Sequence, residues 1–244
     1  MTQAALALDH EPVHYPESDG KPMAETDEHR DEMSDLIGAF RRFYANRDDV
    51  YVSGNLLLYY KEGDPKKRRA PDVFVVLGVE NRQRRTYRLW EEEVPPKLVI
   101  EVTSRGTKNE DQKEKRALYA RLGVDLYFLY DPLAEYLEPP FQGFRRVGND
   151  YQPMVAPQGG PFPCPELGLN LVLDENGRLQ IVDCEAGEIV QRLPVALEQT
   201  EDRLAQEIEA RRNAEETQRQ AEAQLRTLQA EVERLRRGDA GDAS

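Results

Sequence analysis

The sequence lacks long apolar runs and has few cysteines. Of its 244 residues, 39% are hydrophobic and 32% are charged, and no stretch approaches the roughly 20 apolar residues of a membrane-spanning helix. The apolar run at residues 4–8 is too short for a secretion signal and has no basic residue before it. Cys164 and Cys184 show no metal-binding or redox spacing. We therefore expect a soluble, cytoplasmic protein with reduced thiols and no membrane partner.

An excess of positive charge is also missing. The chain has 33 lysines and arginines against 46 acidic residues, which gives a net charge of -13. Binding to duplex nucleic acid is driven by neutralising phosphates, so the total charge does not favour it. The basic residues nevertheless cluster at residues 66–69, 82–85 and 145–146. A local basic rim can guide a polyanion to a site, although solvated surface charge explains each cluster taken singly.

Two apolar segments of strand length each carry or follow an acid. Residues 98–102 are branched and apolar except for Glu101, and Asp72 follows Pro71 at the start of another apolar segment, residues 73–77. A carboxylate in a buried strand takes up a proton unless it is paired, and both an arginine and a metal ion are candidate partners. If the two strands are neighbours, the two carboxylates form an oxygen site suited to Mg²⁺.

A helix is predicted over residues 108–122, which contain no proline and end before Gly123. Asp111, Lys115 and Tyr119 are each four residues apart and therefore lie on one face of that helix. An exposed ion pair beside a tyrosine is one interpretation. The two acids nearby favour another, in which Lys115 serves a catalytic site.

The elements around this region have clear patterns. A helix over residues 27–46, capped by Thr26, shows apolar residues at helical spacing. A strand is predicted at residues 50–60, and residues 126–130 form an aromatic strand parallel to residues 98–102. Short apolar segments separated by glycine and proline then predict antiparallel hairpins, with strands at residues 169–173, 179–182 and 189–193.

Four regions follow from these patterns. We expect a loosely ordered segment at residues 1–24, a folded domain at 25–193, a charged helix or coiled coil at 194–237, and a disordered tail at 238–244. Residues 195–237 contain neither proline nor glycine. Apolar residues occupy heptad positions there at Leu197, Leu204, Ala214, Ala221, Leu225, Leu228, Val232 and Leu235. Arg211 and Gln218 interrupt this seam, so a weak dimer and a solitary charged helix are both open.

The ordered set of motif residues resembles a known family. It runs through Pro71-Asp72, Glu101, Ser104, Asp111, Lys115, Tyr119 and Tyr130-Asp131-Pro132. This set is similar to the Uma-type family of restriction endonucleases, within the PD-(D/E)xK superfamily, over roughly residues 17–193. The resemblance implies a mixed α/β (α+β) domain, a restriction-endonuclease-like mixed sheet flanked by helices, with the long C-terminal helix or coiled coil appended.

The resemblance also implies an activity and its residues. It implies an endonuclease that hydrolyses phosphodiester bonds, in DNA, with Mg²⁺ or Mn²⁺ as cofactor. The metal ligands implied are Asp72, Glu101 and the backbone carbonyl of Val102. Lys115 is the implied catalytic lysine, with Asp111 to hold it and Tyr119 beside it.

One departure from the family pattern bears on the lysine. The usual lysine, two residues after the strand acid, is Thr103 here, so the lysine must come from the helix. Lys115 fits the family spacing better than Lys113 does. Glu17 and His29 are further counterparts of the acid that the first helix of the superfamily contributes.

A different class of function is also open. The domain can be a catalytically inactive binding or scaffolding module that dimerises through its C-terminal coiled coil. Thr103 and the acidic total favour this alternative, whereas Asp72 and Glu101 oppose it.

Overall fold

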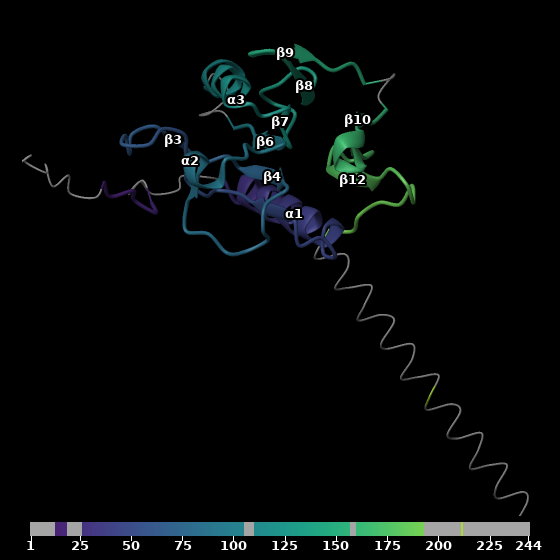
Figure 1. Cartoon of the computed structure of the whole chain (residues 1–244). Helices are drawn as coiled ribbons and strands as arrows, with labels where there is room; N and C mark the ends of the chain where they lie inside the picture. Colours follow the sequence, from purple (N-terminus) through teal and green to yellow (C-terminus); the bar gives the residue numbers. More distant parts are fainter. Residues whose placement is uncertain (1–12, 19–25, 105–109, 157–159, 193–210, 212–244) are drawn as a thin grey trace, which may run out of the picture. The chain divides into compact units, whose positions relative to one another are not determined.

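The computed structural model describes residues 13–18, 26–104, 110–156, 160–192 and 211, without the side chains of residues 110–112. The chain divides into two units, Met1–Arg192 and Leu193–Ser244. Only Arg211 of the second unit is described, so the fold below is that of the first unit (Figure 1). The helix predicted at 194–237, the tail at 238–244 and most of segment 1–24 lie outside the described residues.

A mixed sheet of six strands forms the centre of the first unit, in the order β1-β4-β6-β7-β8-β9. The pair β6–β7 is parallel, as predicted, and every other neighbouring pair is antiparallel. The mixed α/β fold expected from the sequence is therefore confirmed. The strands are β1 (Val50–Ser53), β4 (Val73–Leu77), β6 (Leu98–Val102), β7 (Leu126–Tyr130), β8 (Phe141–Val147) and β9 (Asp150–Pro153).

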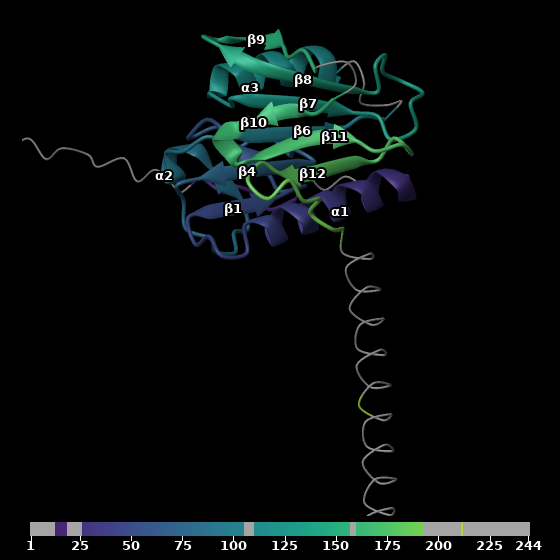
Figure 2. The ribbon, with the colours of Figure 1, turned by 90° about the vertical axis from the view of Figure 1, so that its right-hand side faces the viewer.

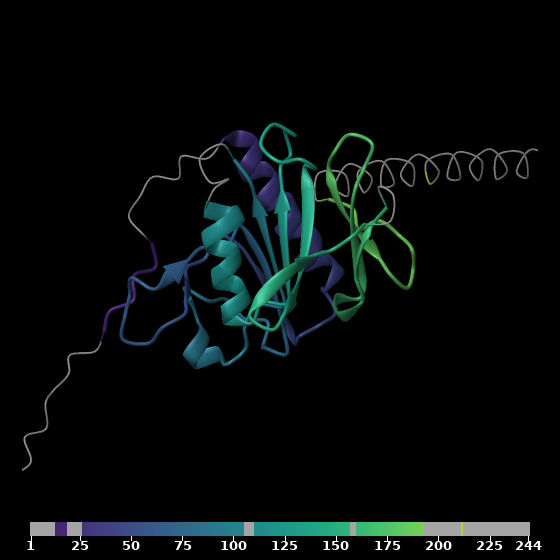
Figure 3. The same ribbon diagram turned by 90° about the horizontal axis from the view of Figure 1, so that it is seen from above.

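Helices α1 (Asp27–Phe43) and α3 (Arg116–Leu122) lie on opposite faces of this sheet (Figure 3). Helix α1 begins where expected, because the Thr26 side chain accepts a hydrogen bond from the His29 backbone N–H at 3.2 Å. Helix α3 ends at Gly123, whose φ of 91° is a left-handed conformation that glycine adopts without a Cβ clash. Each helix therefore starts or stops at a residue with a local chemical reason.

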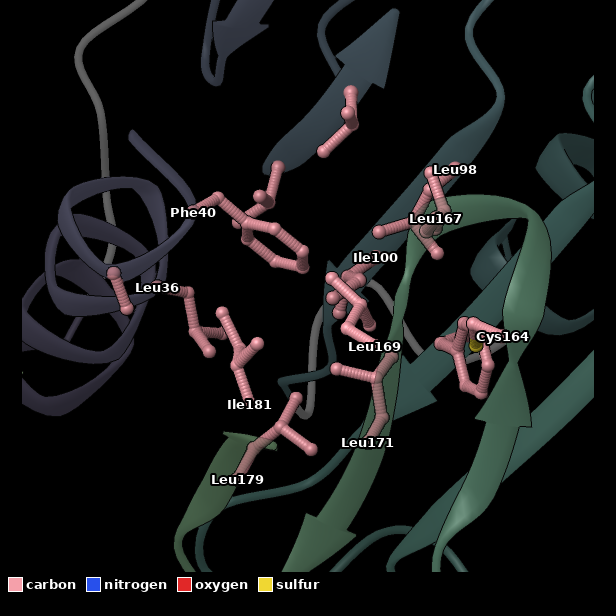
Figure 4. Close-up of a cluster of buried hydrophobic side chains, with 14 of the residues drawn as sticks. Leu36, Phe40, Leu98, Ile100, Cys164, Leu167, Leu169, Leu171, Leu179 and Ile181 are labelled. Carbon is pink, nitrogen blue, oxygen red and sulfur yellow. The ribbon is translucent and has the colours of Figure 1, made fainter. Parts of the chain in front are cut away.

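A second sheet covers the same face of the central sheet as α1 (Figure 2). Its strands are β10 (Phe162–Cys164), β11 (Leu169–Leu173) and β12 (Leu179–Asp183), with a short 3₁₀ turn at Pro165–Leu167. The β11–β12 hairpin agrees with the predicted one, and Ile189 forms only an isolated bridge with Val182. The core between these layers joins side chains of α1, β6 and the second sheet (Figure 4), among them Leu36, Phe40, Leu98, Ile100, Leu169, Leu171, Leu179 and Ile181.

The opposite face packs against α3 and a small third sheet. That sheet has the order β3-β2-β5 and precedes the short helix α2 (Leu89–Glu92). Its strands are β2 (Leu58–Tyr59), β3 (Arg68–Arg69) and β5 (Tyr87–Arg88). Tyr119 and Ala120 of α3, Leu58 and Tyr87 share one buried cluster with the residues of this face. Two separate cores thus hold the central sheet, one on each side.

The structure differs from the predicted elements in two places near the site. The single strand expected at residues 50–60 is divided into β1 and β2. At the break, Asn55 has a φ of 49°, and Gly54 lies so close to the backbone oxygen of Asp72 that an added Cβ would be 2.0 Å from it. The helix expected from residue 108 has a different start. Residues Glu110–Lys115 form a π-helical turn, and regular α-helix begins only at Arg116.

The described helices bear on the membrane prediction. Among the residues that the structure describes, no helix has both the length and the apolar character needed to cross a bilayer.

Candidate active site

The two predicted acids come from neighbouring strands. Strand β4 pairs antiparallel with β6, with Val73 opposite Ile100, and one more step of this register sets Asp72 opposite Glu101. Opposite residues of an antiparallel pair project from the same face of the sheet. The Asp72 carboxylate is also tied to β6 directly, because its Oδ2 accepts a hydrogen bond of 2.8 Å from the backbone N–H of Val102. The two acids are thus held at one end of this strand pair.

Glu101 is fully buried and faces helix α3. Its Oε2 accepts a hydrogen bond from Nζ of Lys115 at 2.8 Å, and its Oε1 accepts one from the Tyr119 hydroxyl at 2.9 Å. Lys115 is itself only 9% exposed, so the ammonium group compensates a carboxylate that burial would otherwise neutralise. Burial and the nearby Glu101 charge raise the pKa of Tyr119 well above its usual value, which keeps the hydroxyl protonated as a donor.

Asp72 lies closer to solvent, with its side chain 14% exposed. Nε2 of His29, near the start of α1, is 3.4 Å from its Oδ2. Burial alone would raise the pKa of Asp72, but the interaction with His29, the positive charge of Lys115 and the Val102 N–H together hold that pKa below its usual value. The site therefore contains an ionised carboxylate at neutral pH.

Not every site residue predicted from the sequence lies beside Asp72 and Glu101. Lys115, Tyr119 and His29 all contact one of the two acids. The side chain of Asp111 lies outside the described part of the chain, so its predicted contact with Lys115 stays a prediction. Two further candidates have other environments: Lys113 is exposed, and Glu17 forms an exposed ion pair of 2.9 Å with Arg85.

Thr103 occupies the position where the family pattern has a lysine. It is only 3% exposed, and its backbone N–H donates to the Tyr130 carbonyl at 2.6 Å. Because side chains alternate along a strand, Thr103 projects to the same side as Glu101. Its Oγ1 is buried and has no hydrogen-bond partner among the described residues. Apart from that alternation, no pattern in the sequence predicts this buried hydroxyl.

The three basic clusters seen in the sequence have different environments. Arg145 pairs with Glu166, and Arg146 pairs with Asp125 at 2.6 Å. The cluster at residues 66–69 includes strand β3, and Arg69 lies 3.8 Å from Glu114, the residue before Lys115. That basic strand therefore adjoins the helical segment that carries the lysine. Arg84, in the remaining cluster, forms a nearly buried ion pair with Glu92.

The donor atoms at this site fit a hard divalent cation. Two carboxylates from adjacent strands are oxygen ligands of the kind that Mg²⁺ prefers, and Mg²⁺ commonly takes one or two carboxylates and completes its octahedron with waters. Among the described residues, no three His, Cys, Asp or Glu side chains form a metal cluster of their own. Asp72 and Glu101 are the carboxylates of this site whose oxygens could hold such an ion.

The chain is similar to known proteins in sequence and in structure. No curated protein matches the sequence. A solved crystal structure described as "a putative nuclease belonging to DUF820 from Anabaena variabilis" is similar, with a TM-score of 0.44 and 15% sequence identity, over 60% of this chain and 76% of that chain. Over residues 2–176, more than half of its length, the chain matches the family Uma2, described as "Putative restriction endonuclease", and it belongs to this family.

Proposed function

We propose that the first unit is a Mg²⁺-dependent endonuclease that hydrolyses phosphodiester bonds in DNA. The observation that supports this most is the meeting of three charged side chains at one end of the strand pair. Asp72 is fixed to β6 by the Val102 N–H, and Glu101 is bonded to Lys115 at 2.8 Å. Two carboxylates and an ammonium group at one point are what metal-assisted phosphodiester hydrolysis requires.

The roles of the residues follow from their charges and partners. Asp72, Glu101 and the carbonyl of Val102 would hold the ion, which supplies polarisation of the scissile phosphate and a lowered pKa for a bound water. Lys115 is bonded to Glu101, and it would offset negative charge on the phosphate as the new bond forms. Asp111 would hold Lys115 from the preceding turn.

Tyr119 and His29 would act as positioning residues. The Tyr119 hydroxyl fixes one oxygen of Glu101, which leaves that carboxylate a single orientation toward Lys115. His29 approaches Oδ2 of Asp72 at 3.4 Å from helix α1. Each acid of the pair thus has a neighbour from a helix, Asp72 from α1 and Glu101 from α3.

A metal titration tests the first part of this proposal. Isothermal calorimetry with Mg²⁺ or Mn²⁺ should show saturable binding to the full-length protein at millimolar ion or below. Asp72→Ala should abolish that binding, whereas Asp125→Ala, which removes an acid from the other end of the sheet, should preserve it. Absence of metal binding by the unmodified protein would remove the enzyme assignment.

A plasmid assay tests the lysine. Conversion of supercoiled DNA to nicked and linear forms should need Mg²⁺, and Lys115→Ala should lower its rate by about 10²–10³-fold, the usual effect of removing one group that stabilises the transition state. Lys113→Ala is the matched control, because that exposed lysine lies two residues away on the same turn. Equal cleavage by Lys115→Ala and the unmodified protein would reject the role given to Lys115.

Thr103 favours a second candidate function. A threonine with a buried, unsatisfied hydroxyl at the customary lysine position suits an inactive domain that serves as a binding or scaffolding module. Such a module would dimerise through residues 194–237. Metal binding without cleavage, together with a dimer that is lost when residues 194–244 are removed, would favour this function over the enzyme.

A further inference from the structure

A polar pocket of about 390 Å³ lies along the outer edge of the central sheet. Strand β1 is the edge strand there, and the loop after β4 together with helix α1 completes the walls. The lining contains no acidic residue, although the chain as a whole has a net charge of -13. It consists of Arg41, Tyr51, Val52, Ser53, Asn81, Arg82, Gln83 and Arg84. Three guanidinium groups without a carboxylate in the wall indicate a site for an anion.

Arg84 is the fixed part of this pocket. Its side chain is 2% exposed, forms a bidentate ion pair with Glu92 and lies 4.2 Å from the centre of the Tyr51 ring. The remaining nitrogen donates to backbone carbonyls of Glu80 and Arg82. Because its donors are used, Arg84 contributes positive charge and a rigid wall rather than a new hydrogen bond.

Other lining groups have donors to spare. Nε of Arg41 donates to the Val52 carbonyl at 3.2 Å, which orients the guanidinium, while its two terminal nitrogens have no partner among the described residues. Among the described residues, the side-chain amides of Asn81 and Gln83 form no hydrogen bond either, and both residues are exposed. Arg82 is about half exposed, shares Glu92 with Arg84 and lies 3.6 Å from Glu80. Several donors therefore converge on a space whose lining contains no carboxylate.

The pocket lies beside the candidate active site. Ser53 ends β1, and the next residue, Gly54, packs directly against the backbone oxygen of Asp72. Strand β1 is two strands from β6, which carries Glu101. At about 4.8 Å between strands, the lateral component of the separation is roughly 10 Å. A nucleic-acid strand bound at the active site would have to extend at least that far to reach the pocket.

We propose that this pocket is a phosphate-binding subsite, which holds the backbone of the nucleic-acid substrate a few nucleotides from the scissile bond. The proposal rests on the function proposed above. Arg41, Arg82, Asn81 and Gln83 bind a phosphate of the strand, and Arg84 fixes the wall. The subsite sets the path of the substrate without reading its bases, since its donors face backbone oxygens.

Binding can be measured apart from cleavage. Fluorescence anisotropy of a labelled 20-nucleotide DNA, single-stranded and duplex, is recorded with the full-length protein in EDTA, which prevents hydrolysis. Arg41→Gln combined with Arg82→Gln should weaken binding by about tenfold and reduce the slope of log K against log salt by about one to two. Arg121→Gln, which removes one charge from an exposed arginine at the end of α3, is the control and should change either quantity by well under half as much.

A second variant covers the case in which the double variant fails to fold. Gln83→Glu places one negative charge in the pocket at an exposed residue that makes no hydrogen bond within the described residues. It should weaken DNA binding by several-fold while the thermal midpoint stays unchanged. Inorganic phosphate at millimolar concentration should compete with DNA in the unmodified protein and should compete less in Gln83→Glu.

The outcomes separate this inference from the proposed function. Pocket-dependent DNA binding without cleavage supports the subsite while it overturns the nuclease assignment. Cleavage with DNA binding that the pocket variants leave unchanged, or that Arg121→Gln lowers equally, overturns the subsite alone. Binding of poly-glutamate in place of DNA would also overturn it, because the pocket would then be a site for an acidic polypeptide.

Discussion

Two buried acids end neighbouring parallel strands of this fold and have different surroundings. Glu101 of β6 and Asp131, the residue after β7, are 0% and 1% exposed, and strands β6 and β7 are paired in register. Glu101 is bonded to two long side chains of one helical segment. Asp131 accepts hydrogen bonds from the backbone N–H groups of Leu133, Tyr136 and Leu137.

The difference lies in whether the partners can be exchanged. Backbone donors of a tight loop are fixed, so Asp131 can release them only if the loop unfolds, and its task is to hold that loop. Lys115 is joined to Glu101 through its own side chain, so rotation of that side chain would release Oε2 to a cation or a substrate. Burial of an acid therefore does not by itself mark a catalytic group, and the kind of partner it has must be considered as well.

The largest expected effect comes from Glu101→Gln. Glutamine keeps an oxygen that can accept the Lys115 hydrogen bond but loses the charge, so cleavage of supercoiled DNA should fall by about 10³-fold. The thermal midpoint should fall as well, because the buried Lys115 ammonium loses its counter-charge, so cleavage is compared well below the midpoint of the variant. A variant that cleaves at the normal rate would break the comparison, because Glu101 would then be as structural as Asp131.

Asp131→Ala should lower the stability of the protein and leave its metal affinity unchanged. It strands three backbone donors, and each unsatisfied buried group costs about 1–3 kcal/mol, so the free energy of unfolding should drop by roughly 3 kcal/mol or more. Urea denaturation measures this loss. Metal affinity of the folded fraction should match that of the unmodified protein, and a selective loss of affinity would place Asp131 in the site.

Tyr119→Phe should lower stability and cleavage by an intermediate amount. It tests what helix α3 contributes to the site. Phenylalanine fills the same space but leaves Oε1 of Glu101 without its donor, which should cost about 2 kcal/mol of stability. Because Lys115 remains bonded to Oε2, cleavage should fall by less than in Lys115→Ala. Equal losses in the two variants would show that the tyrosine hydroxyl contributes as much as the ammonium group.

The smallest effect is expected at Asp125, before β7, whose partners are side chains but whose position is distant from the site. Burial would raise its pKa, and hydrogen bonds from Lys97 and Arg146 lower it to below its usual value. Its contribution to stability is therefore complete above the unfolded pKa of about 4 and is lost as pH falls through the lower folded value. The difference in thermal midpoint between the unmodified protein and Asp125→Asn should shrink below about pH 4. A constant difference down to pH 3 would contradict the assigned pairing.

Strands with strong patterns were predicted well from the sequence. Apart from Glu101, residues 98–102 and 126–130 are apolar or aromatic because both faces of the central sheet are covered, and their parallel pairing follows from the helix between them. The single strand predicted at residues 50–60 was wrong in extent. Its break depends on the backbone of Gly54 meeting the oxygen of Asp72, a contact between distant parts of the chain.

The sequence by itself determined which residues carry charge in apolar strands, where helix α1 begins, and the order of the motif residues. Those properties follow from local chemistry: side-chain periodicity, capping and turn residues. Only the tertiary structure decided which acids acquired exchangeable partners, that His29 lies beside Asp72, and that Arg41 meets Arg82 and Arg84 across the edge of β1. Each of these depends on residues far apart in the chain, and their separation in space is fixed by the packing of helices on the sheet rather than by spacing along the sequence.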